Sequence, residues 1–318
     1  MAAPEMHFRI QDLEAFRLFA LTGSVTETAS LLRLSQPAVS QTLRDFEAEV
    51  GMSLFRKSGR TLQLTAEAVE FLPEVEEFIR HYGRIKDKAL ELRTGKAGTL
   101  TVASIPTLLQ HTIPTAACRF SQVRPNIRLS FGSFTAAETA RRIKNGLADL
   151  GLAFLPTNEF HIDAKPLLRT AITCFLPRDH HLAGRKALRA RDLANERIIS
   201  QGADSPPGYV LKSYFSEARL SEWPSVEANQ SHVALSLAAS GMGIALTHPL
   251  HMFAHVQSSL VAIPFEPRVE LTLAVLRPLS ASNRVAEEFE RSLEDVLREK
   301  TLYLTRDGIF SEMVAAAP

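Results

Sequence analysis

The segment that begins at Ser35 places a row of hydrogen-bonding side chains at the start of a predicted helix. Ser35 can cap this helix, and Pro37 falls in the first turn, where its missing N–H costs nothing. An apolar stripe that starts at Val39 predicts one buried face ending before Gly51. The polar side chains beside this stripe are Gln36, Ser40, Gln41 and Arg44. Glutamine can pair with adenine, proline can touch a thymine methyl group, and serine or arginine can reach phosphate or guanine, so this chemistry suits the reading of DNA.

Two shorter helices are needed to hold this segment in place. The first is predicted to begin after Asp12, which can cap it, and to end at Gly23. The second begins after Ser24, another capping residue. Its residues predicted to face inward are Ala29, Leu31 and Leu32. Short helices joined by a tight turn, the last one with exposed polar residues at its N-terminus, form the layout of a helix-turn-helix that enters the major groove.

A basic hairpin is predicted directly after these helices. The sequence from 54 to 65 turns at Ser58 and Gly59 and contains no acidic residue. Its cations are Arg56, Lys57 and Arg60. Because phosphate contacts supply much of the affinity for DNA, this hairpin suits a wing that lies over the phosphates of the minor groove.

A long amphipathic helix is predicted from Thr65 to about residue 94. Its apolar residues recur at intervals of four and three: Leu64, Ala68, Phe71, Val75, Phe78, Tyr82, Ile85, Ala89 and Leu92. This spacing is typical of a helix that pairs with another helix. A seam of roughly 40 Å is too long for a small head domain to cover, so we predict a dimer formed through this helix. Pro73 is predicted to kink the helix or to mark its start one turn in.

The remainder of the chain alternates strand and helix patterns. Strands are predicted at 99–105, 127–133 and 149–155, with helices at 106–122 and 136–145 between them. This order predicts a parallel sheet, and a second unit of the same kind spans 170–269. A strand at 271–276 and a helix at 283–297 are predicted to return to the first lobe. The tail from 301 to 318 carries no functional signal.

Neutral polar residues are predicted to gather where the strands of the two lobes end. Ligands in open α/β sheets bind beyond the carboxyl ends of strands, where helix N-termini direct N–H groups at them. The residues selected in this way are Ser104, Thr107, Ser133, Thr135, Phe154, Gln201, Asn229, Gln230 and Thr247. As a set they predict a pocket for a small polar or anionic molecule between two lobes, although any one serine or threonine taken singly is expected to cap a helix.

Composition is that of an ordinary globular protein. The chain has 318 residues, 45% of them hydrophobic, with 36 Lys plus Arg against 35 Asp plus Glu. Cys118 and Cys174 are too few for a disulfide scaffold, and no apolar run is long enough to span a bilayer, so a cytoplasmic protein with no membrane partner is expected. The near-neutral charge predicts few phosphate contacts per DNA-reading head, and hence tight binding only through several linked heads.

The string from Ala29 to Thr65 resembles the winged helix-turn-helix of LysR-type transcriptional regulators. It contains S-Q-P-A-V-S followed by L-x-x-x-E-x-x-x-G-x-x-L-F, and it departs from the family at Gln41, where arginine is frequent, and at Ala68, where glycine is frequent. The resemblance implies a non-enzymatic regulator that binds double-stranded promoter DNA under the control of a small-molecule inducer. It also implies a homo-oligomer, with a tetramer and RNA polymerase as further expectations.

The resemblance further implies a fold and a class of inducer. The fold is an α/β class, with an all-α-dominated winged helix-turn-helix before two α/β lobes that resemble type 2 periplasmic binding proteins. The run L-P-E-V-E at 72–76 is similar to opine- and amino-acid-responsive members, which indicates an amino acid or opine as the inducer and no other cofactor. The expected domains are 1–65 (DNA-binding), 66–94 (linker helix), 95–300 (effector-binding; lobe I at 95–169 and 270–300, lobe II at 170–269) and the tail.

The same residues allow other functions and sites. The main alternative is a solute-binding or ligand-sensing protein whose N-terminal region makes protein contacts only. A spacing seen in metal sites occurs at His248, His251 and His255. Because no companion carboxylate motif is present, these histidines are predicted to lie on a surface helix and no metal is assigned. Both cysteines lie in apolar stretches and are expected in the core rather than in a redox pair. No motif of a catalytic site is present, so no enzyme activity is expected.

Overall fold

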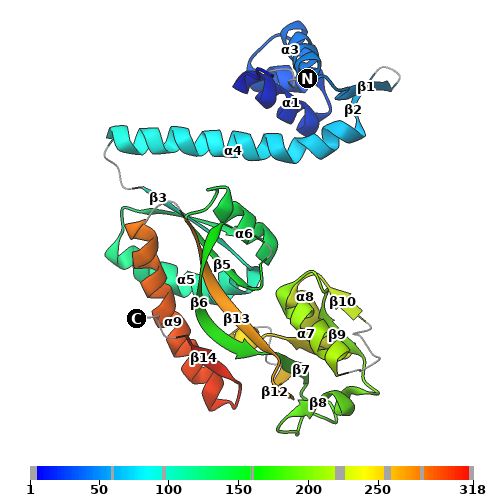
Figure 1. Ribbon diagram of the computed structural model, residues 1–318, viewed down its shortest axis with the longest axis vertical. Helices are drawn as coiled ribbons and strands as arrows, with labels where there is room; N and C mark the ends of the chain where they lie inside the picture. Colours follow the sequence, from blue (N-terminus) through cyan, green and yellow to red (C-terminus); the bar gives the residue numbers. More distant parts are fainter. Residues whose placement is uncertain are drawn as a thin grey trace. The chain divides into compact units, whose positions relative to one another are not determined.

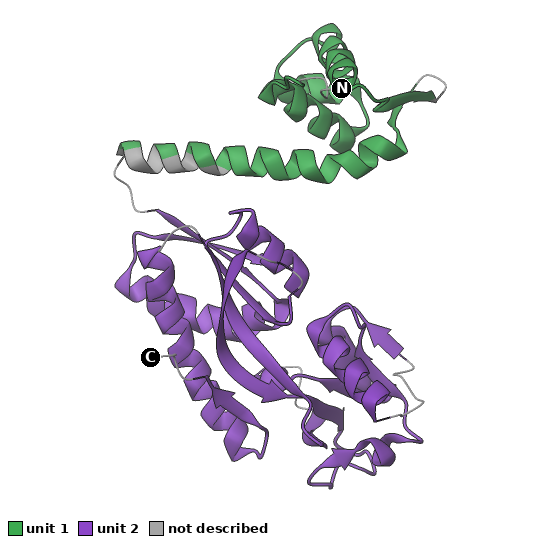
Figure 2. Ribbon diagram, in the orientation of Figure 1, with its two compact units in different colours: residues 1–95 green, residues 96–318 purple. Residues whose placement is uncertain are grey.

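Two compact units make up the chain, Met1–Gly95 and Lys96–Pro318 (Figure 2). A computed structural model describes residues 6–58, 61–94, 98–157, 159, 161–218, 226–253, 259–279 and 283–314. Within these residues, every helix is too short or too polar to cross a lipid bilayer. The two units are described separately below.

The first unit contains the predicted helix-turn-helix, the hairpin and the long helix (Figure 1). Its elements are α1 (Ile10–Thr22), α2 (Val25–Leu32), α3 (Gln36–Val50), β1 (Phe55–Ser58), β2 (Thr61–Leu64) and α4 (Ala66–Thr94). The predicted caps are confirmed, because the Ser24 hydroxyl accepts the N–H of Glu27 at 3.3 Å and the Ser35 hydroxyl accepts that of Ala38 at 3.4 Å. Gly51 ends α3 in the left-handed region at φ 71°.

Two predictions for the first helices were wrong. Helix α1 begins at Ile10 rather than after Asp12, whose carboxylate accepts the backbone N–H of Arg9 at 3.1 Å and so caps the helix from its third position. Asp12 is also buried. In α2, Ala29 is buried as predicted, but the side chain of Leu31 is 58% exposed, because an eight-residue helix turns only one narrow face to the core.

An aromatic cluster forms the core of this unit. The ring of Phe16 lies 5.5 Å from that of Phe46 and 6.2 Å from that of Phe71, centroid to centroid. These residues come from α1, α3 and α4, and the fully buried Leu54 before β1 belongs to the same cluster. Burial of such large side chains fixes the three helices relative to one another.

Helix α4 buries its apolar seam only as far as Val75. Ala68 and Val75 are buried against the core of the unit, whereas Phe78 and Ile85 are 50% and 56% exposed. The prediction that Pro73 marks the helix start was wrong, because α4 begins at Ala66 and continues through Pro73. The side chain of Leu92, the last residue of the predicted seam, lies outside the described residues.

Lobe I of the second unit is built on a mixed six-stranded sheet with the strand order β14-β6-β13-β5-β3-β4. Its elements are β3 (Thr99–Ser104), α5 (Pro106–Val123), β4 (Arg128–Ser133), α6 (Ala136–Lys144), β5 (Leu150–Leu155), β6 (Ile162–Ala171), β13 (Glu270–Pro278), α9 (Arg284–Arg306) and β14 (Ser311–Met313). Strand β3 pairs in parallel with β4 and β5, which confirms the predicted parallel arrangement. The predicted return of the chain is also confirmed, because β13 pairs with β5 and β6.

Lobe II contains a second six-stranded sheet, with the order β10-β9-β11-β7-β12-β8. Its elements are β7 (Thr173–Pro177), β8 (Leu188–Arg189), η1 (Ala190–Leu193), β9 (Ile198–Gln201), α7 (Pro206–Glu217), β10 (Val226–Ala228), α8 (Ser231–Ala239), β11 (Ile244–Thr247), η2 (Pro249–Phe253) and β12 (Leu260–Glu266). Strands β10, β9 and β11 are parallel. The chain crosses between the lobes twice, from β6 to β7 and from β12 to β13 (Figure 1).

The C-terminal residues belong to the fold of lobe I. Helix α9 continues beyond the predicted end at residue 297 to Arg306, and the fully buried Phe289 packs its inner face into the lobe. Strand β14 then pairs with β6, which brings Ser311 opposite Thr170. The residues expected to form a featureless tail therefore complete a sheet edge.

Candidate nucleic-acid interface and interlobe cavity

The polar face of α3 is exposed at its N-terminal end. Gln36, Pro37, Gln41 and Arg44 are exposed and Ser40 is half-buried. Ser35, the capping residue, is exposed as well. The opposite face of α3 supplies Val39, Leu43 and Phe46 to the core, so the same packing that buries the apolar stripe turns the hydrogen-bonding side chains outward.

The amide of Gln41 has a defined orientation. Arg44 donates to its Oε1 at 2.8 Å, and its Nε2 donates to Oδ1 of Asp45 at 2.6 Å. A guanidinium can only donate and a carboxylate can only accept, so the two partners fix which end of the amide is oxygen. Asp45 was not predicted from the sequence, although its spacing of four residues from Gln41 on one helix was a usable signal.

One carboxylate holds the hairpin against α3. Oε1 of Glu47 accepts the N–H of Leu54 at 2.8 Å and that of Phe55 at 2.9 Å. The hairpin strands then pair from Phe55 with Leu64 to Ser58 with Thr61. The cations at its described positions, Arg56 and Lys57, are exposed, whereas the predicted contact Arg60 lies outside the described residues.

A cavity of about 260 Å³ lies between the lobes of the second unit. Its walls in lobe I are Ile105, Pro106, Thr107, Phe134, Thr135, Ala136, Ala137 and Phe154. Its walls in lobe II are Gln201, Asp204, Ser205, Pro206, Pro207, Asn229, Gln230, Ser231 and His248. The predicted pocket residues that reach it are Thr107, Thr135, Phe154, Gln201, Asn229 and Gln230.

Three predicted pocket residues do not line this cavity. Ser104 is fully buried and its hydroxyl donates to the carbonyl of Ile105 at 3.2 Å, while Thr247 is fully buried and donates to Oε1 of Gln201 at 3.5 Å. Ser133 is exposed outside the cavity. The physical reason is strand alternation, because successive side chains at a strand end point to opposite faces.

Four helices begin at the cavity wall. The first residues of α5, α6, α7 and α8 all line it. The hydroxyls of Thr135 and Ser205 cap α6 and α7, whereas in the described structure no side chain caps α5 or α8. Backbone N–H groups at the starts of α5 and α8 are therefore available to an anion, which the helix dipoles also favour.

Buried hydrogen bonds join the two lobes at this wall. Nε2 of His251 lies 2.6 Å from the Ser231 hydroxyl in lobe II and 3.1 Å from the Thr107 hydroxyl in lobe I. The ring of His251 stacks on that of His248 at 4.6 Å, and His248 lies 4.7 Å from the ring of Phe154. The prediction of a surface helix for these histidines was wrong, since both are almost fully buried; His255 lies outside the described residues.

Burial keeps both imidazoles neutral and makes stability depend on pH. It lowers the pKa of His248 to about 3, and together with the nearby His248, His232 and His111 it lowers the pKa of His251 well below its ordinary value. The unfolded chain binds these protons near pH 6.5, so the stabilisation is present above that pH and is lost as pH falls toward the folded pKa. We expect the free energy of unfolding to fall by roughly 1.4 kcal/mol per pH unit per histidine below about pH 6.5.

Chemical denaturation between pH 7.5 and 5 measures this slope. The variant His251→Gln keeps a side chain that can hydrogen-bond to Thr107 and Ser231 but removes one titrating group. Its slope is expected to be shallower than that of the unaltered chain by roughly 1.4 kcal/mol per pH unit. Identical slopes in both proteins would contradict the assignment.

Several cavity residues were not predicted, although sequence patterns pointed to them. Ser205 is followed by two prolines and caps α7, which repeats the pattern of a serine shortly before a proline seen at Ser35. Asp204 precedes it and is the charged residue in the cavity wall. Ser231 and His248 directly follow the predicted residues Gln230 and Thr247, so shifting the selection by one residue would have found them.

The two cysteines lie in different environments. Cys174 is buried in β7, as expected, and burial raises the pKa of its thiol. Cys118 is exposed on α5, so its assignment to the core was wrong. The apolar residues beside it gave a wrong prediction of burial, because Ala116 and Phe120 face the core from the opposite side of the same helix.

Comparison with known proteins identifies relatives of both units. Residues 10–69 match the family described as "Bacterial regulatory helix-turn-helix protein, lysR family", and residues 93–298 match the "LysR substrate binding domain". The chain is 28% identical over 295 residues to the octopine catabolism/uptake operon regulatory protein OccR of Rhizobium meliloti, covering 91% of this chain and 97% of that protein. It is 27% identical over 308 residues to the transcriptional activator LysR of Escherichia coli, covering 96% and 98%.

Solved structures share the fold. Full-length CbnR in complex with its target DNA has a TM-score of 0.72 at 18% identity, covering 91% of this chain and all 100% of that one. Full-length BenM has a TM-score of 0.55 at 18% identity, covering 94% and 98%. Both likenesses extend over the winged helix-turn-helix and the two-lobed unit.

Proposed function

The chain belongs to the LysR family of bacterial transcriptional regulators, and we propose that it reads promoter DNA with the exposed face of α3 and the wing. It is a DNA-binding regulator with an effector-binding domain. The residues proposed to contact DNA are Ser35, Gln36, Pro37, Ser40, Gln41, Arg44, Arg56, Lys57 and Arg60. The observation that supports this assignment is the exposed amide of Gln41, whose orientation is fixed by Arg44 and Asp45. It lies among the exposed polar residues of α3, and Glu47 joins the basic hairpin to the same helix.

A gel-shift assay on the promoter upstream of the protein's own gene tests this assignment. The triple variant Gln36→Ala, Pro37→Ala and Arg44→Ala removes direct base contacts, each worth about 1–3 kcal/mol, so its affinity is expected to fall at least about 100-fold. The matched control, Gln11→Ala with Arg80→Ala, removes one glutamine and one cation from exposed positions away from this face. Equal binding by the triple variant and the control would rule the assignment out.

Salt dependence measures the contribution of the wing. Removing one phosphate contact is expected to reduce the slope of log affinity against log salt by about one. The variant Arg56→Ala with Lys57→Ala is therefore expected to reduce the slope by about two per head. A solute-binding protein whose N-terminal unit makes protein contacts only would show no slope on DNA, and the relatives give no support to that alternative. An unchanged slope in the variant would exclude wing–phosphate contacts.

The effector is proposed to carry both a carboxylate and a cationic nitrogen, as an amino acid or an opine does. The uncapped starts of α5 and α8 suit the carboxylate, and Asp204, which also lines the cavity, suits the cation. The residues proposed to bind it include the predicted Thr107, Thr135 and Gln201. OccR is named as a regulator of octopine catabolism, which supports the same class.

A thermal-shift screen with amino acids, opines and aromatic acids tests this class. Ligand that binds only the folded state raises the melting temperature, so amino acids or opines are expected to stabilise the protein. The variant Asp204→Asn is expected to abolish this response, because it removes the counter-charge without changing the shape of the side chain. If only aromatic acids raise the melting temperature, the proposed class is wrong.

The assembly is proposed to be a dimer through α4, with a tetramer as the complete form. The exposed Phe78 and Ile85 support pairing along the part of this helix that follows Val75. Linking several heads would also raise the affinity for DNA, which the low net charge makes necessary because each head makes few phosphate contacts. Contact with RNA polymerase and a cytoplasmic location follow from this proposed role as expectations.

A further inference from the structure

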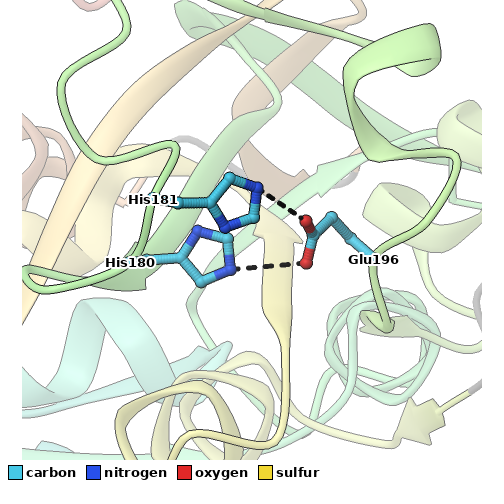
Figure 3. Close-up of side chains that lie close together, drawn as sticks. All are labelled: His180, His181 and Glu196. Carbon is cyan, nitrogen blue, oxygen red and sulfur yellow. Dashed lines mark ion pairs between the residues drawn. The ribbon is translucent and has the colours of Figure 1, made fainter.

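Two adjacent histidines and a glutamate converge in lobe II, outside the interlobe cavity. Nε2 of His180 lies 3.3 Å from one carboxylate oxygen of Glu196, and Nε2 of His181 lies 3.2 Å from the other (Figure 3). The two imidazoles stack with ring centroids 4.5 Å apart. The histidines follow β7 and Glu196 precedes β9, so the cluster joins two connections of the same sheet.

The backbone holds these residues in place. The N–H of His180 donates to the carbonyl of Pro177 at 3.1 Å, and the N–H of Glu196 donates to that of Leu193 at 2.9 Å. The side chains of His180 and Glu196 are only 18% and 16% exposed, whereas that of His181 is 69% exposed. The three side chains are therefore already close together, and the cluster is open to solvent on one side.

Its dimensions and donor atoms suit a divalent transition-metal ion. The three donor atoms lie within 4.8 Å of one another. A tetrahedral ion with imidazole and carboxylate ligands at 2.0–2.2 Å holds its donor atoms roughly 3.3–3.6 Å apart. The imidazole nitrogens lie 3.3 and 3.2 Å from the carboxylate of Glu196, each from a different oxygen, which is close to this separation. Two imidazoles and one carboxylate favour Zn²⁺ and its neighbours over Mg²⁺ or Ca²⁺, which prefer oxygen ligands.

We propose that lobe II binds one transition-metal ion of the Zn²⁺ class through His180, His181 and Glu196, with water in the remaining position. This site is independent of DNA reading and of the effector cavity, whose walls include none of these residues. An ion here ties the connection after β7 to the connection before β9. The site needs no companion motif in the sequence, because the glutamate comes from a separate connection.

Binding requires a change of tautomer at His180. Its Nδ1 accepts the N–H of Leu182 at 3.2 Å, so in the metal-free chain the ring proton lies on Nε2 and faces Glu196. The ion takes the place of that proton at Nε2, the proton moves to Nδ1, and the Leu182 amide turns away.

Zn²⁺ titration of the untagged full-length protein tests the site, with isothermal calorimetry as the readout. One ion per chain is expected, and the substitutions His180→Ala, His181→Ala and Glu196→Gln are each expected to weaken binding at least tenfold. Mg²⁺ and Ca²⁺ are expected to give no binding in the same range. If His180→Ala does not fold, the exposed His181→Ala still carries the test.

Two control variants separate this site from other histidines. His161→Ala removes an exposed histidine outside the cluster, and His232→Ala removes one that lies near His251. Both are expected to bind Zn²⁺ as the unaltered protein does, and the amide resonance of Leu182 is expected to shift on binding. The proposal would be overturned if the unaltered protein did not bind Zn²⁺, or if Glu196→Gln and His181→Ala bound it as tightly as the unaltered protein. Loss of binding in His232→Ala would also overturn it.

Discussion

Replacing Phe78 and Ile85 by glutamate is expected to convert the protein to a monomer and to lower its affinity for promoter DNA at least about 100-fold. Both side chains are about half exposed on α4 beyond Val75, where the core of the first unit no longer covers the seam. Charges at the centre of a helix pair cost far more than the apolar contacts they replace. Separated heads then bind DNA one at a time, without the effective concentration that linkage provides.

Val69 provides the matched control for this experiment. It is apolar and 58% exposed on the same helix, but it lies half a helical turn from the seam when counted from Phe78. Val69→Glu is expected to remain a dimer and to bind promoter DNA normally. Analytical ultracentrifugation and gel-shift assays measure the two effects, and a double variant that stays dimeric would show that α4 is not the dimer interface.

The substitution Gly208→Ala is expected to destabilise the second unit by about 2–4 kcal/mol and to abolish the thermal response to effector. A Cβ atom at this position would lie 2.0 Å from the carbonyl oxygen of Gly202 and 2.4 Å from that of Gln201, and neither backbone atom can move independently of the cavity wall. Gly208 also donates its N–H to the capping hydroxyl of Ser205 at 3.2 Å. The added carbon must therefore displace the start of α7 from the cavity.

Gly184→Ala is the control for Gly208, because a Cβ there meets no atom within 4 Å. Its stability is expected to be within about 0.5 kcal/mol of the unaltered chain. Chemical denaturation of the full-length proteins measures the difference, and DNA binding by the first unit reports whether the damage is local. A Gly208→Ala protein with normal stability and a normal effector response would refute the close-approach argument.

The sequence was most informative where short-range signals determine structure. The caps at Ser24 and Ser35 and the stripe from Val39 to Phe46 act within one or two helical turns, and the structure contains them as predicted. The parallel pairing of β3 with β4 and β5 was also accessible, because a strand-helix-strand pattern favours parallel strands. These features are local, and one sequence is enough to recognise them.

The sequence was least informative where distant segments meet. Strand β14 pairs with β6, which lies about 140 residues earlier, and no local pattern marks a three-residue strand. The burial of His248 and His251 depends on Thr107 in the other lobe, so a helix-spacing argument placed them on the surface. At Ser104 and Thr247 the end of the strand was correctly located, but the face of the sheet to which each side chain points was not.

The two hydrogen bonds accepted by Glu47 have a consequence for how transcription is switched. They join the hairpin to α3, and the aromatic cluster packs α3 against α1, so we expect each DNA-binding unit to keep one recognition surface. Under the proposed function, we expect an inducer to alter the distance and rotation between the DNA-binding units. We therefore expect promoters that differ in the number of base pairs between half-sites, rather than in the half-sites themselves, to distinguish the induced from the uninduced regulator.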